Sequence, residues 1–139
     1  MLISYHYYPS YLAFYQATIS KPLAAIDAFI KSGEPFTLQT VSQLLHISQQ
    51  EVSYLCYAKQ IQHWDTPAFL NIMVSGSSHV CQFYQREVHI GYLHCYSPRD
   101  VAYIYDLDQG LVQEIFEQLG VQTIRSSAMG QVLARIGPS

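Results

Sequence analysis

Histidine and cysteine residues cluster between residues 79 and 95. Their side chains are common ligands of zinc in proteins. The cluster consists of His79, Cys81, His89, His94 and Cys95, with Cys56 and His63 further upstream. It contains neither a Cys-x-x-Cys nor a His-x-x-x-His pair, and the adjacent His94 and Cys95 would point in different directions. Core cysteines and surface histidines explain the same residues. We therefore predict no metal site and no cofactor.

The second kind of site considered for these residues is a cysteine nucleophile activated by a histidine. Cys81 has His79 and His89 within ten residues, but nothing around it marks an activated thiolate. The chain has no glycine-rich phosphate loop and no Ser nucleophile elbow. Asp106 and Asp108 are explained by a turn and a helix cap. The sequence thus predicts a protein that is not an enzyme.

Composition limits the partners that the chain can bind. Its 139 residues are 50% hydrophobic and 12% charged, with a formal net charge of −3. This charge argues against wrapping nucleic acid by bulk electrostatics, although seven Lys and Arg can still form a local patch. A surface with so few charges favours self-association, so we expect a homodimer or a standing protein partner.

The expected location is the cytoplasm, without contact to a membrane. Three cysteines are an odd number with no framework spacing, which indicates reduced thiols. The residues after Met1 lack the basic and apolar regions of a secretory signal, and no apolar run reaches the length of a membrane span.

The elements that must position any functional residue are helices. An aromatic segment at residues 1–20 includes Tyr5 and Tyr7, and Ser10 is a candidate cap for a short helix there. Ser20 and Pro22 predict the start of the next helix, which ends at Ser32-Gly33.

Two helical hairpins are predicted near residues 37–59 and 97–119. In the first, Thr37 caps one helix and Ser48 caps the next, with Glu51 placed to complete a capping box. In the second, Ser97-Pro98 and Asp108 mark the corresponding helix starts, and Gly120 marks the end.

The apolar positions of the two hairpins repeat at an offset of 60 residues. The first copy has Val41, Leu45, Ile47, Val52 and Leu55, and the second has Val101, Tyr105, Leu107, Val112 and Ile115. A small residue, Ser42 or Ala102, follows the first position, where two helices must approach closely. This spacing predicts two helices packed across each other around an apolar turn residue.

The sequence of residues 66–90 is compatible with two structures. Thr66-Pro67 resembles a helix start, and Ser77 or Ser78 can cap a further helix that closes near Gly91. A β-hairpin turning at residues 75–78 would instead form a small wing. We favour the helices.

The stretch from Thr37 to Leu55 resembles the helix-turn-helix family of DNA-binding regulators over its whole length, and Ser97 to Ile115 resembles it more weakly. Both copies depart from the family at the turn, where His46 and Asp106 stand in place of the usual glycine. Both residue types are enriched in the left-handed conformation, so the departure is tolerable.

The resemblance implies that the second helix of a hairpin enters the major groove of DNA. In the first copy, the residues that would face DNA are Gln49, Gln50, Ser53, Tyr54 and Tyr57, with Lys59 reaching the backbone. Gln can bind adenine in a bidentate manner, and Ser and Tyr can bind phosphate or base edges. The second copy presents Gln109, Gly110, Gln113, Glu114 and Glu117. Its two carboxylates would repel DNA, so this copy is expected to contact protein.

The sequence therefore predicts a mainly α protein with two helix-turn-helix lobes, residues 1–62 and 63–139, and a β-hairpin wing as the open alternative. The leading interpretation is a DNA-binding transcriptional regulator that uses residues 48–59. The alternative is a protein–protein adaptor or dimerisation module with no role in nucleic-acid binding. A positive surface around Lys59 would favour the first, and a neutral or negative one the second.

Overall fold

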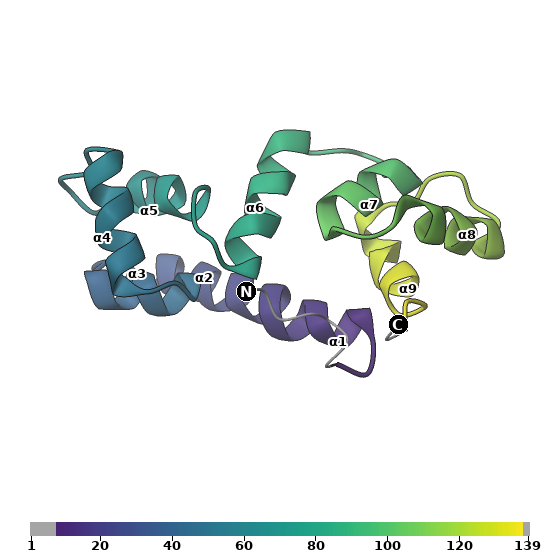
Figure 1. Cartoon of the computed structure of the whole chain (residues 1–139), viewed down its shortest axis with the longest axis horizontal. Helices are drawn as coiled ribbons and strands as arrows, with labels where there is room; N and C mark the ends of the chain where they lie inside the picture. Colours follow the sequence, from purple (N-terminus) through teal and green to yellow (C-terminus); the bar gives the residue numbers. More distant parts are fainter. Residues whose placement is uncertain (1–7, 138–139) are drawn as a thin grey trace. The chain divides into compact units, whose positions relative to one another are not determined.

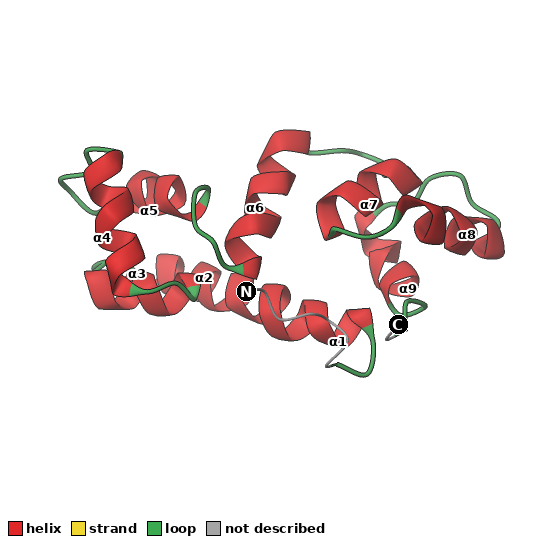
Figure 2. Cartoon of the chain, viewed as in Figure 1, coloured by secondary structure: helices red, strands yellow, loops and turns green. Residues whose placement is uncertain are grey.

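The protein is built from helices, as the sequence predicted. The computed structural model describes residues 8–137, and Figure 2 shows helices joined by loops along that whole range. The only β pairing among these residues is one isolated antiparallel bridge, between Tyr96 and Ile124. The expected aromatic residues Tyr5 and Tyr7 lie outside the described range.

The helices follow one another in the order shown in Figure 1. They are α1 (Tyr11–Tyr15), the π-helical turn η2 (Gln16–Ser20), α2 (Lys21–Ser32), α3 (Leu38–Leu45), α4 (Gln49–Ala58), α5 (Thr66–Met73), α6 (His79–Ile90), α7 (Pro98–Tyr105), α8 (Gln109–Leu119), the 3₁₀ turn η3 (Ser126–Ala128) and α9 (Met129–Leu133).

Residues 66–90 form α5 and α6, so the alternative of a β-hairpin wing is not realised there. The start of α5 differs from the prediction by one residue. Asp65, not Thr66, is the N-cap, because its Oδ1 accepts a hydrogen bond from the Ala68 amide at 2.8 Å. Pro67 still lies in the first turn, where its missing N–H costs nothing.

The start of α2 is confirmed: the helix begins at Lys21, after Ser20, with Pro22 in its first turn. Ser20 has a helical backbone (φ −64°, ψ −48°) and makes no side-chain cap, because the helical path continues from η2 into α2. Pro22 has no N–H to donate to a carbonyl one turn earlier, so regular α-helical hydrogen bonding is interrupted there.

Backbone contacts divide the described residues into two compact units. The first unit comprises residues 16–85, and the second comprises residues 8–15 together with 86–137. Division of the chain into folding lobes at residues 62 and 63 stays a prediction.

The core of the first unit joins the first helical hairpin to the two helices that follow it. Val41, Leu45 and Val52 are fully buried. They belong to one apolar cluster with Ile26, Ile47, Leu55, Phe69, Ile72, Met73, Val80 and Cys81. Burial of such aliphatic side chains contributes about 1.5–3 kcal/mol each, which makes this cluster the main source of the unit's stability.

The second unit packs α7, α8, α9 and α1 together. Its buried side chains include Val101, Val112, Phe116 and Val132. Tyr11 of α1 is also buried there: its amide donates to the Ile136 carbonyl at 3.0 Å and its hydroxyl donates to the Tyr105 carbonyl at 2.6 Å. At least this part of the N-terminal aromatic segment therefore serves the fold.

Two leucines of α3 provide a test of the first unit's core. Leu45→Ala removes a fully buried side chain and should lower the free energy of unfolding by about 2–5 kcal/mol. Leu38→Ala, on the same helix but 38% exposed, should cost less than about 1 kcal/mol. Urea unfolding followed by the fluorescence of Trp64, the chain's single tryptophan, measures the first unit specifically. Equal losses for the two variants would contradict the assigned core.

Candidate nucleic-acid interface

The first helix pair, α3 and α4, is defined by hydrogen bonds at its helix ends. Thr37 caps α3 and forms a capping box with Thr40, because each side chain accepts the other residue's backbone amide. The helix ends at His46, which has the left-handed conformation (φ 57°). Ser48 then caps α4 by accepting from the Glu51 amide at 3.0 Å.

The second helix pair, α7 and α8, repeats these features 60 residues later. Ser97 forms a capping box with Asp100, Asp106 is left-handed (φ 56°), and Asp108 caps α8. The turns are closed alike: the Ile47 amide donates to the Ser42 carbonyl at 3.2 Å, and the Leu107 amide donates to the Ala102 carbonyl at 2.9 Å. His46 and Asp106 thus adopt the conformation expected of them at the position where glycine is usual.

The ten apolar positions of the repeat lie where their spacing predicted, with one difference. Nine are buried, and Leu107 is only partly buried, whereas its counterpart Ile47 is buried. The two pairs share a packing pattern but differ in how completely the turn residue is covered.

Five of the predicted site residues form the outer face of α4. Gln49, Gln50, Ser53, Tyr54 and Tyr57 are all exposed, Tyr54 at 66% and Tyr57 at 85%. Residues four apart on a helix are neighbours on its surface, so Gln49, Ser53 and Tyr57 form one row and Gln50 lies beside Tyr54. None of the five carries a charge, and the face therefore offers amide, hydroxyl and aromatic groups.

Lys59 follows directly after α4 and is partly buried. Its ammonium group donates to the Asn71 amide oxygen on α5 at 3.1 Å. This partner is a neutral amide, and the bond directs the Lys59 side chain toward α5.

Glu51 does not complete the predicted capping box. Its carboxylate instead accepts two hydrogen bonds from Ser77, from the amide at 2.9 Å and from the hydroxyl at 2.7 Å. Ser77 lies 26 residues away in the turn between α5 and α6. Ser77 offers two hydrogen-bond donors, its amide and its hydroxyl. It therefore takes the place of the single donor that a capping box would supply, the backbone amide of Ser48.

The turn between α5 and α6 also contacts the end of α3. The Ser78 hydroxyl donates to the Leu45 carbonyl at 2.6 Å, which satisfies one of the last carbonyls of that helix. Gly76 is buried in the same turn, and a Cβ there would overlap the Cys81 Sγ and lie 3.6 Å from the Ile47 Cδ1. Sequence reasoning missed this contact; the one available signal was a glycine among three serines.

Charge is scarce throughout the first unit. It carries three lysines, Lys21, Lys31 and Lys59, against four acidic residues, Asp27, Glu34, Glu51 and Asp65, so its formal charge is −1. Lys31 pairs with Asp27 at 2.8 Å on the surface of α2. The unit therefore has no large excess of positive charge with which to attract phosphate.

The corresponding face of α8 is acidic. Gln109, Gly110, Gln113, Glu114 and Glu117 are all exposed. From residue 100 to residue 124 the sequence has five acidic side chains and no Lys, Arg or His. Arg99, at the start of α7, is exposed.

The candidate metal ligands are not brought together. Within residues 8–137, no three His, Cys, Asp or Glu side chains form a group that could hold a metal ion. Cys81 is buried, Cys56 is partly buried and Cys95 is exposed. Burial raises the pKa of the Cys81 thiol, and of Cys56 likewise, which opposes formation of a nucleophilic thiolate.

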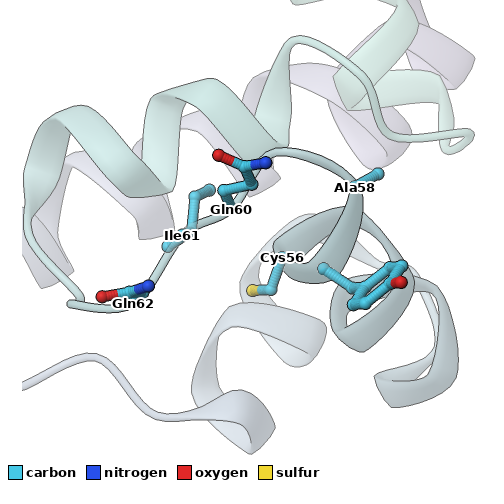
Figure 3. A pocket seen from close by; sticks show the side chains of 6 residues that line it. Cys56, Ala58, Gln60, Ile61 and Gln62 are labelled. Atoms are coloured by element: carbon cyan, nitrogen blue, oxygen red, sulfur yellow. The ribbon is translucent and has the colours of Figure 1, made fainter.

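A shallow hollow of about 550 Å³ lies at the C-terminal end of α4. Its lining is Cys56, Tyr57, Ala58, Gln60, Ile61 and Gln62 (Figure 3). Ile61 and Cys56 supply partly buried apolar surface, and the two glutamines supply exposed amides. The hollow adjoins the Tyr57 end of the outer face of α4.

Comparisons with protein-family models, curated proteins and solved structures found no match to this chain. Among the described residues, no helix combines the length and apolar character that a membrane crossing requires.

Gly76 allows a test of the close approach between the α5–α6 turn and the first helix pair. Gly76→Ala should destabilise the protein by about 1–3 kcal/mol, because the new methyl group overlaps Cys81. Gly130→Ala in α9 meets nothing within 4 Å and should be neutral or stabilising by up to about 1 kcal/mol. Thermal unfolding followed by circular dichroism measures both. The assignment fails if Gly76→Ala proves as stable as Gly130→Ala.

The three thiols should differ in reactivity in the order of their exposure. Ellman's reagent should modify Cys95 at once in the native protein, Cys56 more slowly, and Cys81 only when urea unfolds the chain. The raised pKa of Cys81 adds to this protection by lowering its thiolate fraction. Cys95→Ser should abolish the fast phase; a fast phase that disappears with Cys81→Ser would show that the assigned burial is incorrect.

Proposed function

We propose that this protein is a DNA-binding transcriptional regulator that reads base edges with the outer face of α4. The observation that supports the proposal is the arrangement of this face: five uncharged residues capable of base or phosphate contacts are exposed together along one side of α4, beginning at its first residue. The second helix of a pair packed in this way is the one that enters the major groove in helix-turn-helix proteins.

Each residue of the face has a suitable partner on DNA. Gln49 and Gln50, in the first turn of α4, would bind adenine through paired amide hydrogen bonds. Ser53 and Tyr54 would donate to phosphate oxygens or base edges, and Tyr57 would lie toward the rim. Lys59 would contribute the nearby positive charge.

Glu51 is the one acidic residue in the first turn of α4. A carboxylate facing a phosphate would oppose binding. Its two hydrogen bonds to Ser77 hold it against the α5–α6 turn, so that it is compensated by donors within the protein. This arrangement supports the proposal, because it leaves the outer face of α4 without an acidic side chain.

The second unit would act as a protein-contact module. Its charge is −2, from four arginines and six acidic residues, and Glu114 and Glu117 lie at the positions that would face DNA. We propose that this unit mediates homodimerisation or binds another protein, and that the regulator acts in the cytoplasm without catalysis or a cofactor.

The low charge of the first unit favours a second candidate, a protein–protein adaptor. Tyr54 and Tyr57 are exposed aromatics of the kind that anchor protein interfaces, and Tyr57 adjoins the hollow at the end of α4. In this case the same face of α4 would bind a partner protein, and DNA would not be retained at any salt concentration.

The internal repeat supplies a matched pair of variants for testing DNA binding. Gln49 and Gln109 are both the exposed first residue of the second helix in their pair. A duplex enriched from a random-sequence pool by the wild-type protein is the probe. Gln49→Ala should weaken binding by about 1–3 kcal/mol, because a base contact is lost. Gln109→Ala should leave the affinity unchanged.

Salt dependence separates the two candidate functions. Because the first unit carries only three lysines in its sequence, log K should fall with log salt at a shallow slope, about −1 to −3 for each protomer. Failure of the wild-type protein to enrich or retain any duplex at low salt would remove the DNA-binding proposal and leave the adaptor.

A further inference from the structure

The turn between α5 and α6 contacts both helices of the first pair. We call residues 75–78 the clamp turn. Ser78 donates to the Leu45 carbonyl at the end of α3, and Ser77 donates twice to the Glu51 carboxylate in the first turn of α4. Between these two contacts, Gly76 approaches the turn residue Ile47. Three consecutive residues, Gly76, Ser77 and Ser78, thus contact the end of one helix, the connecting turn and the start of the next.

We propose that Glu51, Ser77 and Ser78 are positioning residues, which fix the start of α4 relative to α3 so that its outer face meets DNA in one orientation. This inference rests on the proposed function and names residues that do not themselves touch DNA. Glu51 acts through Ser77, and Ser78 acts through the Leu45 carbonyl.

The chemistry of the contacts suits such a role. A carboxylate that accepts from an amide and a hydroxyl at 2.9 and 2.7 Å forms charge-assisted hydrogen bonds, which are stronger than neutral ones. The Ser78 contact binds a carbonyl that α3 itself leaves without a helical donor. Contacts on both sides of His46 restrict rotation of α4 about the turn, and a recognition surface held in place loses less entropy on binding.

The second helix pair shows that the carboxylate contact of Glu51 is not needed to build the fold. The residue that corresponds to Glu51 is Leu111, which is exposed and has no carboxylate. That pair nonetheless forms the same caps and the same left-handed turn. The second pair has a counterpart of the Ser78 contact, because the Tyr105 carbonyl, which corresponds to that of Leu45, accepts from the Tyr11 hydroxyl at 2.6 Å. The bond between the Glu51 carboxylate and Ser77 is therefore the feature that distinguishes the pair with the glutamine and tyrosine face.

A series of substitutions at Glu51 separates positioning from charge. The probe is the duplex enriched from a random-sequence pool, with each variant studied at a temperature where it is fully folded. Glu51→Ala should weaken binding roughly tenfold, although it removes a negative charge, because α4 loses its hydrogen bonds. Glu51→Gln should stay within about threefold of wild type, since the amide oxygen accepts from the Ser77 amide while the NH2 group donates to the Ser77 hydroxyl oxygen.

Ser77→Ala provides the second arm, because it removes the hydroxyl donor and keeps the amide. We expect a loss of about threefold, and no further loss when it is combined with Glu51→Ala, since the two residues share one contact. Glu34→Ala, which removes an exposed acidic side chain of the first unit outside α4, is the control and should not weaken binding. If Glu51→Ala and Glu51→Gln both strengthen binding by similar factors, Glu51 acts only as a repelling charge and the positioning role is wrong.

Amide hydrogen exchange tests the clamp without DNA. Exchange in the first turn of α4 should become faster in Glu51→Ala but not in Glu51→Gln, while α2 stays at the wild-type rate. Equal acceleration in α2 and α4 would indicate a general loss of stability and overturn the inference. If wild-type protein retains no DNA, the proposed function fails, and the exchange measurement still decides whether the clamp holds α4.

Discussion

The first unit depends on the burial of Ile47 in the turn between α3 and α4. A left-handed residue, His46, reverses the chain so that the next side chain points into the core. There Ile47 joins the cluster that α3, α4, α5 and α6 share, and Gly76 lies beside it and leaves the space that the Cys81 Sγ requires. This packing fixes the position of Ile47. It therefore also sets the angle between α3 and α4 and the direction in which the outer face of α4 points.

The protein carries the same helix pair twice with two different surfaces. Caps, left-handed turns and buried positions agree at an offset of 60 residues, which shows that the packing tolerates large changes on the outside. Tyr54 and Tyr57 correspond to Glu114 and Glu117. Exposed side chains contribute little to stability, so each surface is free to serve a separate interaction.

The first unit carries little positive charge for a candidate DNA-binding protein. In the proposed complex with DNA, the first unit would obtain its affinity from a few well-placed polar contacts, because three lysines neutralise few phosphates. Preorganisation of α4 would then be more valuable, since each contact would count for a larger share of the binding free energy. We propose that the clamp turn provides such preorganisation through the bond between Ser77 and the Glu51 carboxylate.

The sequence by itself determined the helices of the two pairs, their turns and nine of the ten buried positions, because these depend on local caps and on apolar spacing that only a helix pair satisfies. It also placed Gln49, Gln50, Ser53, Tyr54 and Tyr57 on one exposed face. Only the tertiary structure decided the partner of Glu51, since a nearby amide and a distant Ser77 compete for the same carboxylate and the fold brings Ser77 within 2.7 Å. It likewise decided that residues 66–90 are helical, where an apolar run fits a buried helix or a buried strand equally until its packing partners are known.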